Sequence, residues 1–253
     1  MSDVEIATRA LRSLDLTDLN ETCTDQAIGA LCKKALDPHG PVAAVCVWPQ
    51  FVKRAQEGLK GSPVRIATVV NFPAGGEDVS RIMDDTQEAL SDGANEIDLV
   101  LPYKAVIRGD LAVAIEMVEA VRELVDQDRL LKVILETGEL KDAALIETAS
   151  RIAIEAGADF IKTSTGKTSL SATPEAAEIM LNAIKASGRA VGLKPSGGIR
   201  TVADAKIYLD LADRIMGQGW ATPRTFRIGA SSVYDALIAA IEGRAGAAAT
   251  GAY

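Results

Sequence analysis

Two lysine side chains stand at the ends of apolar runs that are typical of buried strands. Lys162 follows Phe160 and Ile161, Lys194 follows the run 191–193, and glycine comes within a few residues of each lysine. Burying an unpaired ammonium group is costly, or it forces the amine to release its proton. A neutral amine is the form that attacks a carbonyl carbon. The two positions therefore indicate imine chemistry.

The physical requirement for that chemistry is a large fall in the lysine pKa. A free lysine has a pKa of about 10.4, so only about one amine in a few thousand is neutral at pH 7. Bringing the pKa to about 7 takes roughly 4–5 kcal/mol of destabilisation of the cation. Partial burial and a second ammonium nearby both supply it. For one lysine, pairing with a carboxylate at the rim of the fold is an equal alternative, but two lysines on adjacent strands favour the chemical interpretation.

Two further charged residues lie inside apolar runs. Asp98, in EIDLVLP, either faces a helix and is capped there, or points inward and pairs with the lysines. Lys132, in LLKVILE, has Ile134 and Glu136 at period 2, so a structural pair between Lys132 and Glu136 on one face of the strand is expected.

Three glycine-containing loops follow late strands. They hold Gly166 and Lys167, then Gly197 and Gly198, then the segment 229–232 with Ser231 and Ser232. Loops that open helices present backbone N–H groups and a positive helix end, which suits a phosphate. Each loop by itself is equally well explained as a tight turn, but three at one end of the fold predict a phosphate site.

The elements that must position these residues alternate between strand and helix types. Apolar, β-branched runs occupy 43–48, 66–72, 97–101, 130–136, 160–165, 191–194 and 226–229, with helical periodicity between them. A weak eighth strand is expected at 214–216. Such strands joined by helices form a parallel sheet, and 253 residues without a linker suit one closed barrel. We predict an α/β fold: a single (β/α)8 TIM barrel over 1–242 with a short N-terminal helical extension, and a flexible C-terminal tail over 243–253.

Composition excludes several classes of function. The formal net charge is −8 and aromatic residues make up 4%, so nucleic-acid binding is not expected. The single histidine argues against histidine metal sites and against Ser–His or Cys–His nucleophile pairs, and three cysteines without CxxC spacing indicate reduced thiols in the cytoplasm. No signal peptide, membrane span, metal or organic cofactor is expected.

The remaining polar positions have simpler default interpretations. Asp15, Thr17 and Asn20 look like a helix N-cap cluster, and Cys46 like a small core residue. The last eleven residues are expected to be a frayed terminus, or else a mobile tail that carries Tyr253.

Taken together, the chain resembles the deoxyribose-phosphate aldolases, a family of class I (Schiff-base) aldolases on a (β/α)8 barrel. The resemblance covers essentially the whole chain, including the terminal tyrosine. It is carried by LDLTDLN (14–20), AAVCVWP (43–49), EIDLVLPY (96–103), LETGELK (135–141), ADFIKTSTGK (158–167), GLKPSGGIR (192–200) and RIGASS (227–232).

The resemblance implies a role for each matching residue. Lys162 would form the Schiff base, Lys194 would lower the Lys162 pKa, and Asp98 would act with Lys194 in proton transfer. The substrate phosphate would lie on Gly166, Lys167, Gly197, Gly198, Ser231 and Ser232. Asp15, Thr17 and Cys46 would line the pocket, and Tyr253 would close over it.

The expected reaction is reversible cleavage of 2-deoxy-D-ribose 5-phosphate to D-glyceraldehyde 3-phosphate and acetaldehyde. The expected partner is this phosphorylated sugar, with a homodimer or another homo-oligomer as the assembly. Two alternatives stay open: another class I or transaldolase-like enzyme for phosphorylated sugars, and a non-catalytic barrel that binds a phosphorylated ligand.

Overall fold

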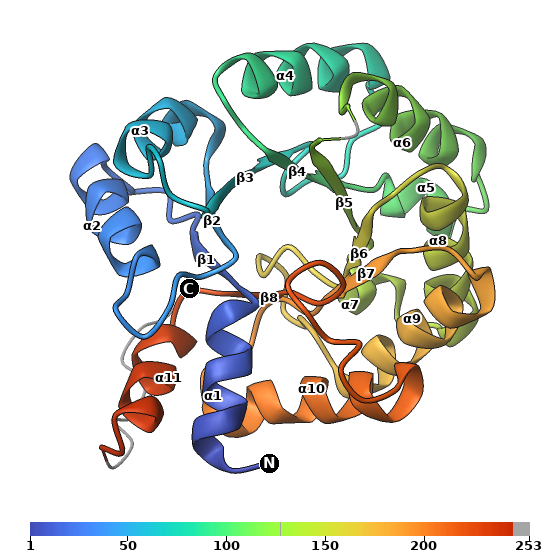
Figure 1. The fold of residues 1–253 in the computed structure, drawn as a ribbon. Coiled ribbons are helices and arrows are strands. Elements are labelled where there is room, and N and C mark those ends of the chain that lie inside the picture. The colour runs from blue at the N-terminus through green and yellow to red at the C-terminus, as the bar shows by residue number, and fades with distance from the viewer. Residues whose placement is uncertain (127, 245–253) are drawn as a thin grey trace.

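The computed structural model describes residues 1–126 and 128–244. Its centre is a ring of eight parallel strands (Figure 1). The strands are β1 (Leu14–Asp18), β2 (Ala44–Val47), β3 (Arg65–Val70), β4 (Glu96–Val100), β5 (Leu130–Ile134), β6 (Phe160–Lys162), β7 (Gly192–Lys194) and β8 (Ile228–Ala230).

Hydrogen bonding closes these strands into a barrel. The strand order is β7-β6-β5-β4-β3-β2-β1-β8, and two isolated parallel bridges, Leu193 with Phe226 and Ser196 with Gly229, connect β7 to β8. The barrel predicted from the alternating pattern is therefore confirmed.

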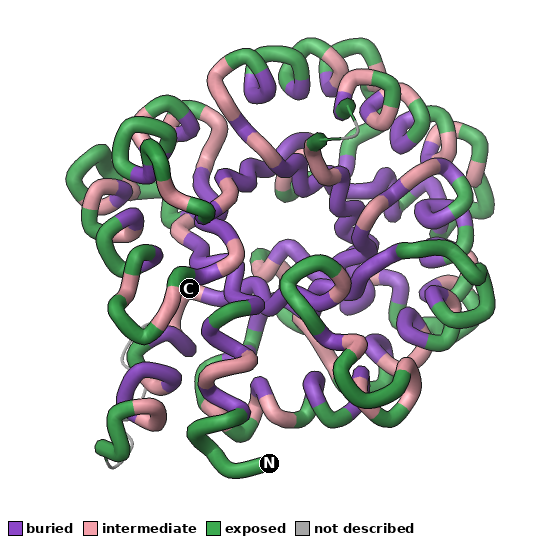
Figure 2. Tube along the Cα trace, in the orientation of Figure 1, coloured by how far each residue is buried: buried purple, intermediate pink, exposed green. Residues whose placement is uncertain are grey.

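Helices surround the barrel and bury their inner faces against it, as Figures 1 and 2 show. They are α1 (Asp3–Arg12), α2 (Asp25–Ala35), the short 3-10 helix η1 (Pro49–Phe51), α3 (Val52–Gly58), α4 (Val79–Ser91), α5 (Tyr103–Ile107), α6 (Ala112–Leu124), α7 (Thr137–Leu140), α8 (Ala143–Glu155), α9 (Pro174–Ser187), α10 (Val202–Met216) and α11 (Val233–Ile241). In the part of the chain that the structure describes, no helix combines the length and the apolar character needed to cross a bilayer.

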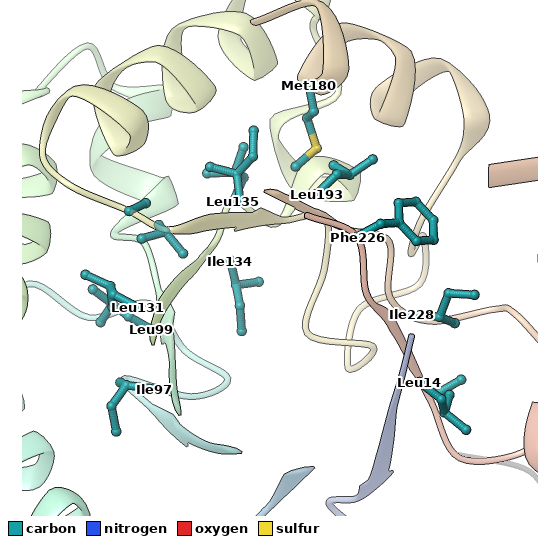
Figure 3. Packing of buried hydrophobic residues seen from close by; sticks show 14 of the residues in the cluster. Leu14, Ile97, Leu99, Leu131, Ile134, Leu135, Met180, Leu193, Phe226 and Ile228 are labelled. Carbon is teal, nitrogen blue, oxygen red and sulfur yellow. The ribbon is translucent and has the colours of Figure 1, made fainter. Parts of the chain in front are cut away.

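The main hydrophobic core fills the space between strands and helices. Leu99, Leu131 and Leu193 are fully buried there, and Met180 of α9 lies beside Leu193 of β7 (Figure 3). Burial of one such side chain stabilises the fold by about 1.5–3 kcal/mol. Because this core lies mainly between the barrel and its helices, polar groups can occupy part of the barrel interior.

Local sequence signals explain where several helices begin and end. Thr173 caps α9 by accepting a hydrogen bond from the Ala176 N–H, and Thr201 and Asp204 form a capping box at the start of α10. After α4 and α8 the chain turns at Gly93 and Gly157, both at φ +106°, where a side chain would be strained.

Two predictions along the chain were wrong, and they are connected. The segment 214–216 is the end of α10, not a strand. The eighth strand is instead β1, so Asp15 and Thr17 lie in a strand rather than in a helix cap. The strand signal is weak because these inward positions are polar, which breaks the apolar run expected of a buried strand.

Candidate active site

Lys162 and Lys194 lie directly opposite each other at the ends of neighbouring strands. They are register partners in β6 and β7, and their side chains are 3% and 1% exposed. The parallel pairing places both amines at the carboxyl end of the barrel.

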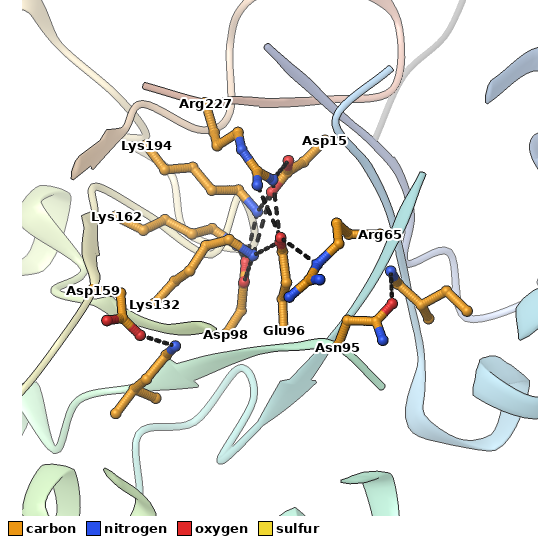
Figure 4. A network of polar contacts seen from close by, with 12 residues as sticks. Asp15, Arg65, Asn95, Glu96, Asp98, Lys132, Asp159, Lys162, Lys194 and Arg227 are labelled. Atoms are coloured by element: carbon orange, nitrogen blue, oxygen red, sulfur yellow. Dashed lines mark hydrogen bonds and ion pairs between the residues drawn. The ribbon is translucent and has the colours of Figure 1, made fainter. Parts of the chain in front are cut away.

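Asp98 holds three lysines together. Its Oδ2 accepts hydrogen bonds from Lys162 Nζ at 2.8 Å and from Lys194 Nζ at 2.7 Å, and its Oδ1 accepts one from Lys132 Nζ at 2.8 Å (Figure 4). Asp98 therefore points into the barrel, and the alternative that it faces a helix is excluded.

The expected pair between Lys132 and Glu136 does not form. Lys132 is the register partner of Asp98, and its Nζ lies 2.6 Å from Glu96 Oε2. Glu136 adopts a left-handed backbone at φ +57°, after β5 has ended, and its carboxylate accepts hydrogen bonds from the Thr165 N–H and hydroxyl. The period-2 argument failed because the strand stops two residues before Glu136.

Two charged residues that the sequence argument missed lie next to this group. Arg227 Nη2 donates to Glu96 Oε1 at 2.8 Å, and Arg227 Nη1 donates to Asp15 Oδ1 at 2.6 Å. Asp15 Oδ2 in turn lies 2.5 Å from Lys194 Nζ. The available signal was periodicity: Glu96 is two residues before Asp98 on the same strand, and Arg227 falls within a predicted strand.

These buried side chains form one ion-paired cluster. Its members are Asp15, Glu96, Asp98, Lys132, Lys162, Lys194 and Arg227. All of its acids come from β1 and β4, in the first half of the chain. All of its bases come from β5, β6, β7 and the residue before β8, in the second half. The cluster thus has three carboxylates and four bases.

The two catalytic candidates differ in how they hold protons. Burial, reinforced by the neighbouring Lys194 ammonium, lowers the pKa of Lys162 even though Asp98 acts against it. Burial also disfavours the Lys194 cation, but Asp15 and Asp98 outweigh it and raise the Lys194 pKa. Lys194 therefore stays an ammonium group, while Lys162 is the lysine that gives up its proton more easily.

The carboxyl groups of the cluster are held ionised. Burial by itself would raise the pKa of Asp98, but Lys132, Lys162 and Lys194 hold it well below its usual value. The same balance lowers the pKa of Asp15, through Lys194 and Arg227, and of Glu96, through Lys132 and Arg227. At neutral pH Asp98 is accordingly a carboxylate that lies beside the Lys194 ammonium group.

An apolar group of side chains lies on the other side of the barrel interior. Cys46 packs with Leu19, Ala44, Ala67 and Val69, and this group is covered by the edge-to-face pair of Trp48 and Phe72. Burial, with a contribution from Asp98, raises the pKa of the Cys46 thiol. Thr17 is the register partner of Cys46, so two of the predicted pocket residues are neighbours.

The three loops predicted to bind phosphate converge at one end of the barrel. A Cβ on Gly197 would lie 3.4 Å from the Gly166 Cα, and the Gly197 N–H donates to the Gly229 carbonyl. Gly198 is at φ +81°, and Ser232 is the N-cap residue of α11 without using its hydroxyl as a cap. Ser231 precedes it at the end of β8. Lys167 Nζ donates to the Leu19 carbonyl at 2.9 Å, next to the end of β1.

Residues 9–231 match the family described as DeoC/LacD family aldolase. The chain belongs to this aldolase family. It is 53% identical over 250 residues to the deoxyribose-phosphate aldolase of Agrobacterium fabrum (strain C58 / ATCC 33970), an alignment that covers 98% of this chain and 96% of that protein.

Solved structures of aldolases share the fold along nearly the whole chain. The apo structure of a protein assigned as a deoxyribose-phosphate aldolase from Toxoplasma gondii ME49 has a TM-score of 0.87 at 26% identity, with 95% of this chain and 97% of that chain covered. The tetrameric deoxyribose phosphate aldolase of Aeropyrum pernix has a TM-score of 0.76 at 25% identity, with 94% and 92% covered.

Two further expectations for this aldolase concern groups outside the ion-paired cluster. Tyr253 lies outside the residues that the structure describes. Within 1–126 and 128–244, no three His, Cys, Asp or Glu side chains are grouped so as to hold a metal ion.

Proposed function

We propose that the chain catalyses the reversible cleavage of 2-deoxy-D-ribose 5-phosphate to D-glyceraldehyde 3-phosphate and acetaldehyde through a Schiff base on Lys162. The observation that carries this proposal is the contact of one carboxylate oxygen, Asp98 Oδ2, with both Lys162 and Lys194 in a buried site. It supports the proposal because Lys162, whose pKa is lowered, contacts the Asp98 carboxylate that also binds the Lys194 ammonium group. The name of the Agrobacterium fabrum relative supports the choice of substrate.

Imine formation begins with the neutral amine of Lys162. Its nitrogen attacks the aldehyde carbon C1 of the open-chain sugar, and the carbonyl oxygen takes a proton from the Lys194 ammonium. The nitrogen of the resulting carbinolamine passes one of its protons through Asp98 and Lys194 to the hydroxyl group, which then leaves as water. An iminium ion linked to Lys162 remains.

Carbon–carbon cleavage uses that iminium as an electron sink. The C3 hydroxyl gives its proton to Asp98 through a water, the C2–C3 bond breaks, and its electron pair moves toward the iminium nitrogen. D-glyceraldehyde 3-phosphate leaves and an enamine remains on Lys162. Protonation at C2, followed by hydrolysis of the imine, releases acetaldehyde and restores the amine.

The phosphate end of the sugar is assigned to the converging loops. The loop N–H groups other than that of Gly197, with Lys167 and the hydroxyls of Ser231 and Ser232, offer hydrogen-bond donors to a dianion. Gly166, Gly197 and Gly198 allow close approach of the backbone. We assign to Tyr253 the role of closing over the bound sugar and assisting proton transfer at C2.

The setting of the enzyme belongs to the same proposal. A homodimer or a larger homo-oligomer is proposed, supported by the tetrameric Aeropyrum pernix aldolase. A cytoplasmic location is proposed because Cys23, Cys32 and Cys46 are all free thiols.

Trapping the Schiff base tests the proposal directly. Acetaldehyde and borohydride should leave an ethyl group on Lys162, identified by peptide mass, and Lys162→Met should abolish this adduct. Activity should favour deoxyribose 5-phosphate over ribose 5-phosphate and fructose 1,6-bisphosphate. An unmodified Lys162, or a preference for fructose 1,6-bisphosphate, would contradict the proposal.

A further inference from the structure

We propose that Arg227 supplies the positive charge that allows Lys162 to stay neutral, and that Arg227 is therefore a positioning residue for the reaction. This inference rests on the proposed role of Lys162 as the nucleophile. Arg227 belongs to the ion-paired cluster but is separated from Lys162 by Asp15, Lys194 and Asp98. It acts through those residues rather than by touching the substrate.

The charge count of the cluster provides the first argument. With every member ionised, three carboxylates face four cations, so the cluster carries one positive charge in excess. Excess charge inside a protein is unfavourable, and the usual relief is the release of a proton by the group that holds it least firmly. A cluster with one neutral lysine has no excess charge.

The contacts of each base indicate which one releases the proton. Lys132 Nζ lies within 4 Å of Asp15, Glu96 and Asp98, and Lys194 Nζ contacts Asp15 and Asp98. Lys162 Nζ contacts only Asp98 among the described carboxylates, and it shares that oxygen with Lys194. An arginine guanidinium does not deprotonate in proteins. Lys162 is therefore the base of the cluster that loses its proton most easily.

The Arg227 guanidinium is buried, so solvent ions cannot take its place beside the carboxylates. Its side chain is 5% exposed, its guanidinium stacks 5.6 Å from the centre of the Phe160 ring, and its Nε donates to the Pro223 carbonyl. Its two terminal nitrogens bind Asp15 and Glu96. A fixed, permanently charged group at this place neutralises carboxylates that would otherwise stabilise the lysine cations.

Other charged and titratable groups also lie around Lys162. They are the same residues in every variant compared below. Asp98 from β4, Lys194 from β7, Cys46 from β2 and Glu136 after β5 act on Lys162 directly. Lys132 from β5 and Asp15 from β1 contact Asp98 and Lys194 instead. Glu136 is buried but binds Thr165 and Thr168 instead of a cluster cation. The direction of the expected shifts does not depend on the charge of Glu136.

Charge changes at Arg227 and Glu96 give predictions of opposite sign. Arg227→Met removes a cation, so the titration midpoint of Lys162 should rise by about one pH unit, the order of magnitude expected when a unit charge acts through intervening side chains at an effective dielectric of about 20. Glu96→Gln removes an anion, so the midpoint should fall. In the double variant the two changes should cancel to within a few tenths of a unit.

The measurement is the pH dependence of Lys162 reactivity in the full-length protein. Competitive acetylation of Lys162, read by peptide mass, reports its neutral fraction without any aldehyde chemistry. Reductive trapping with acetaldehyde and cyanoborohydride is run in parallel. If wild-type Lys162 is acetylated with a low midpoint but never trapped, the proposed function fails while the charge argument still receives its test.

Two control variants separate charge from packing. Arg227→Lys keeps the charge and should leave the midpoint within a few tenths of a unit of wild type. Arg65→Met removes an arginine that lies 3.7 Å from the same Glu96, but whose side chain is 38% exposed and therefore screened, so it should change nothing. Circular dichroism establishes that each variant is folded.

Several outcomes would overturn the inference. They are an unchanged midpoint in folded Arg227→Met, shifts of the same sign for Arg227→Met and Glu96→Gln, or an equal effect of Arg65→Met. If Arg227→Met does not fold, the comparison moves to Glu96→Gln against Glu96→Gln/Arg227→Met. The double variant must then have the higher midpoint by about one unit, and equal midpoints would refute the role of Arg227.

Discussion

The difference between Lys162 and Lys194 comes from the number of carboxylates that each amine contacts. Lys194 contacts Asp15 and Asp98, whereas Lys162 has Asp98 alone. Both side chains are buried to a similar degree, so burial acts on both, and only the second carboxylate separates them. One additional ion pair thus makes two chemically identical groups differ in how firmly they hold a proton.

Replacing Lys194 by Leu should slow the modification of Lys162 by acetaldehyde at neutral pH. Without the neighbouring ammonium the pKa of Lys162 rises, so the neutral fraction is smaller below the new pKa and recovers as the pH increases. The trapping rate of the Lys162 adduct as a function of pH measures this. Lys194→Arg, which keeps the charge, is the matched control, and a profile that does not move in Lys194→Leu would show that Lys194 does not tune Lys162.

Replacing Lys167 by Met should weaken recognition of the phosphate and spare the imine chemistry. A hydrogen bond to a charged group contributes about 1.5–3 kcal/mol, so kcat/KM for deoxyribose 5-phosphate should fall by roughly 10- to 100-fold. The value for unphosphorylated 2-deoxyribose should change little. Kinetics on both sugars make the comparison, and equal losses on the two would place Lys167 outside the phosphate site.

At the scale of the elements, the sequence predicted strands well where several apolar residues follow one another, even around an inward charge. The run 97–101 was recognised and became β4, although it contains Asp98. The strand β1 was missed because Asp15 and Thr17 alternate with Leu14 and Leu16, a pattern that also fits a solvated turn. Asp15 and Thr17, two of the predicted pocket residues, are therefore also the residues that made β1 hard to recognise.

The close packing of β8 against Lys194 predicts the effect of adding one methyl group at Gly229. A Cβ on Gly229 would lie 3.0 Å from Lys194 Cε and 2.8 Å from Ser196 Oγ. Gly229→Ala should displace the lysine and lower kcat by roughly tenfold or more, since small misplacements at a reacting centre have large kinetic effects. Steady-state kinetics on the folded variant measure the change.

A matched glycine elsewhere provides the control for that experiment. Gly29 lies in α2, and the atom nearest to an added Cβ there is the end of the flexible Arg54 side chain. Gly29→Ala should leave kcat unchanged and keep or slightly increase stability, because alanine favours a helix over glycine by about 1 kcal/mol. Normal kcat in Gly229→Ala would show that β8 does not position Lys194.

At the scale of the whole molecule, the barrel was predictable but the partners inside it were not. Strand and helix patterns alternate along the chain, which has the length of one barrel and contains no linker. These features indicate a closed parallel sheet. Which inward side chains meet depends on the register between strands that are far apart in the chain, such as Asp98 in β4 opposite Lys132 in β5. Periodicity within one strand carries no information about that register, and so Lys132 was assigned the wrong partner and Arg227 none.

The cluster also predicts how stability depends on pH. Asp15, Glu96 and Asp98 have folded pKa values below their unfolded ones, so below about pH 5 the unfolded chain binds more protons than the folded one. Their stabilisation is complete above that range and is lost as the pH falls through the folded values. The urea midpoint should therefore decrease steeply from pH 5 to pH 3.

The same measurement on Glu96→Gln tests the source of the effect. With one of the three carboxyl groups removed, fewer protons are taken up on unfolding, so the decrease in midpoint between pH 5 and pH 3 should be smaller. A midpoint that stays constant down to pH 3 in the wild-type protein would show that the cluster does not couple stability to pH.

The division of the cluster between the two halves of the chain has a consequence for assembly. Within the ion-paired cluster, β1 and β4 supply only acids, and β5, β6, β7 and the residue before β8 supply only bases. A half-barrel that paired with a copy of itself would bury charges of one sign, whereas pairing with the other half neutralises them. The charges inside the barrel therefore favour pairing of the two different halves of one chain over the exchange of matching halves between two chains.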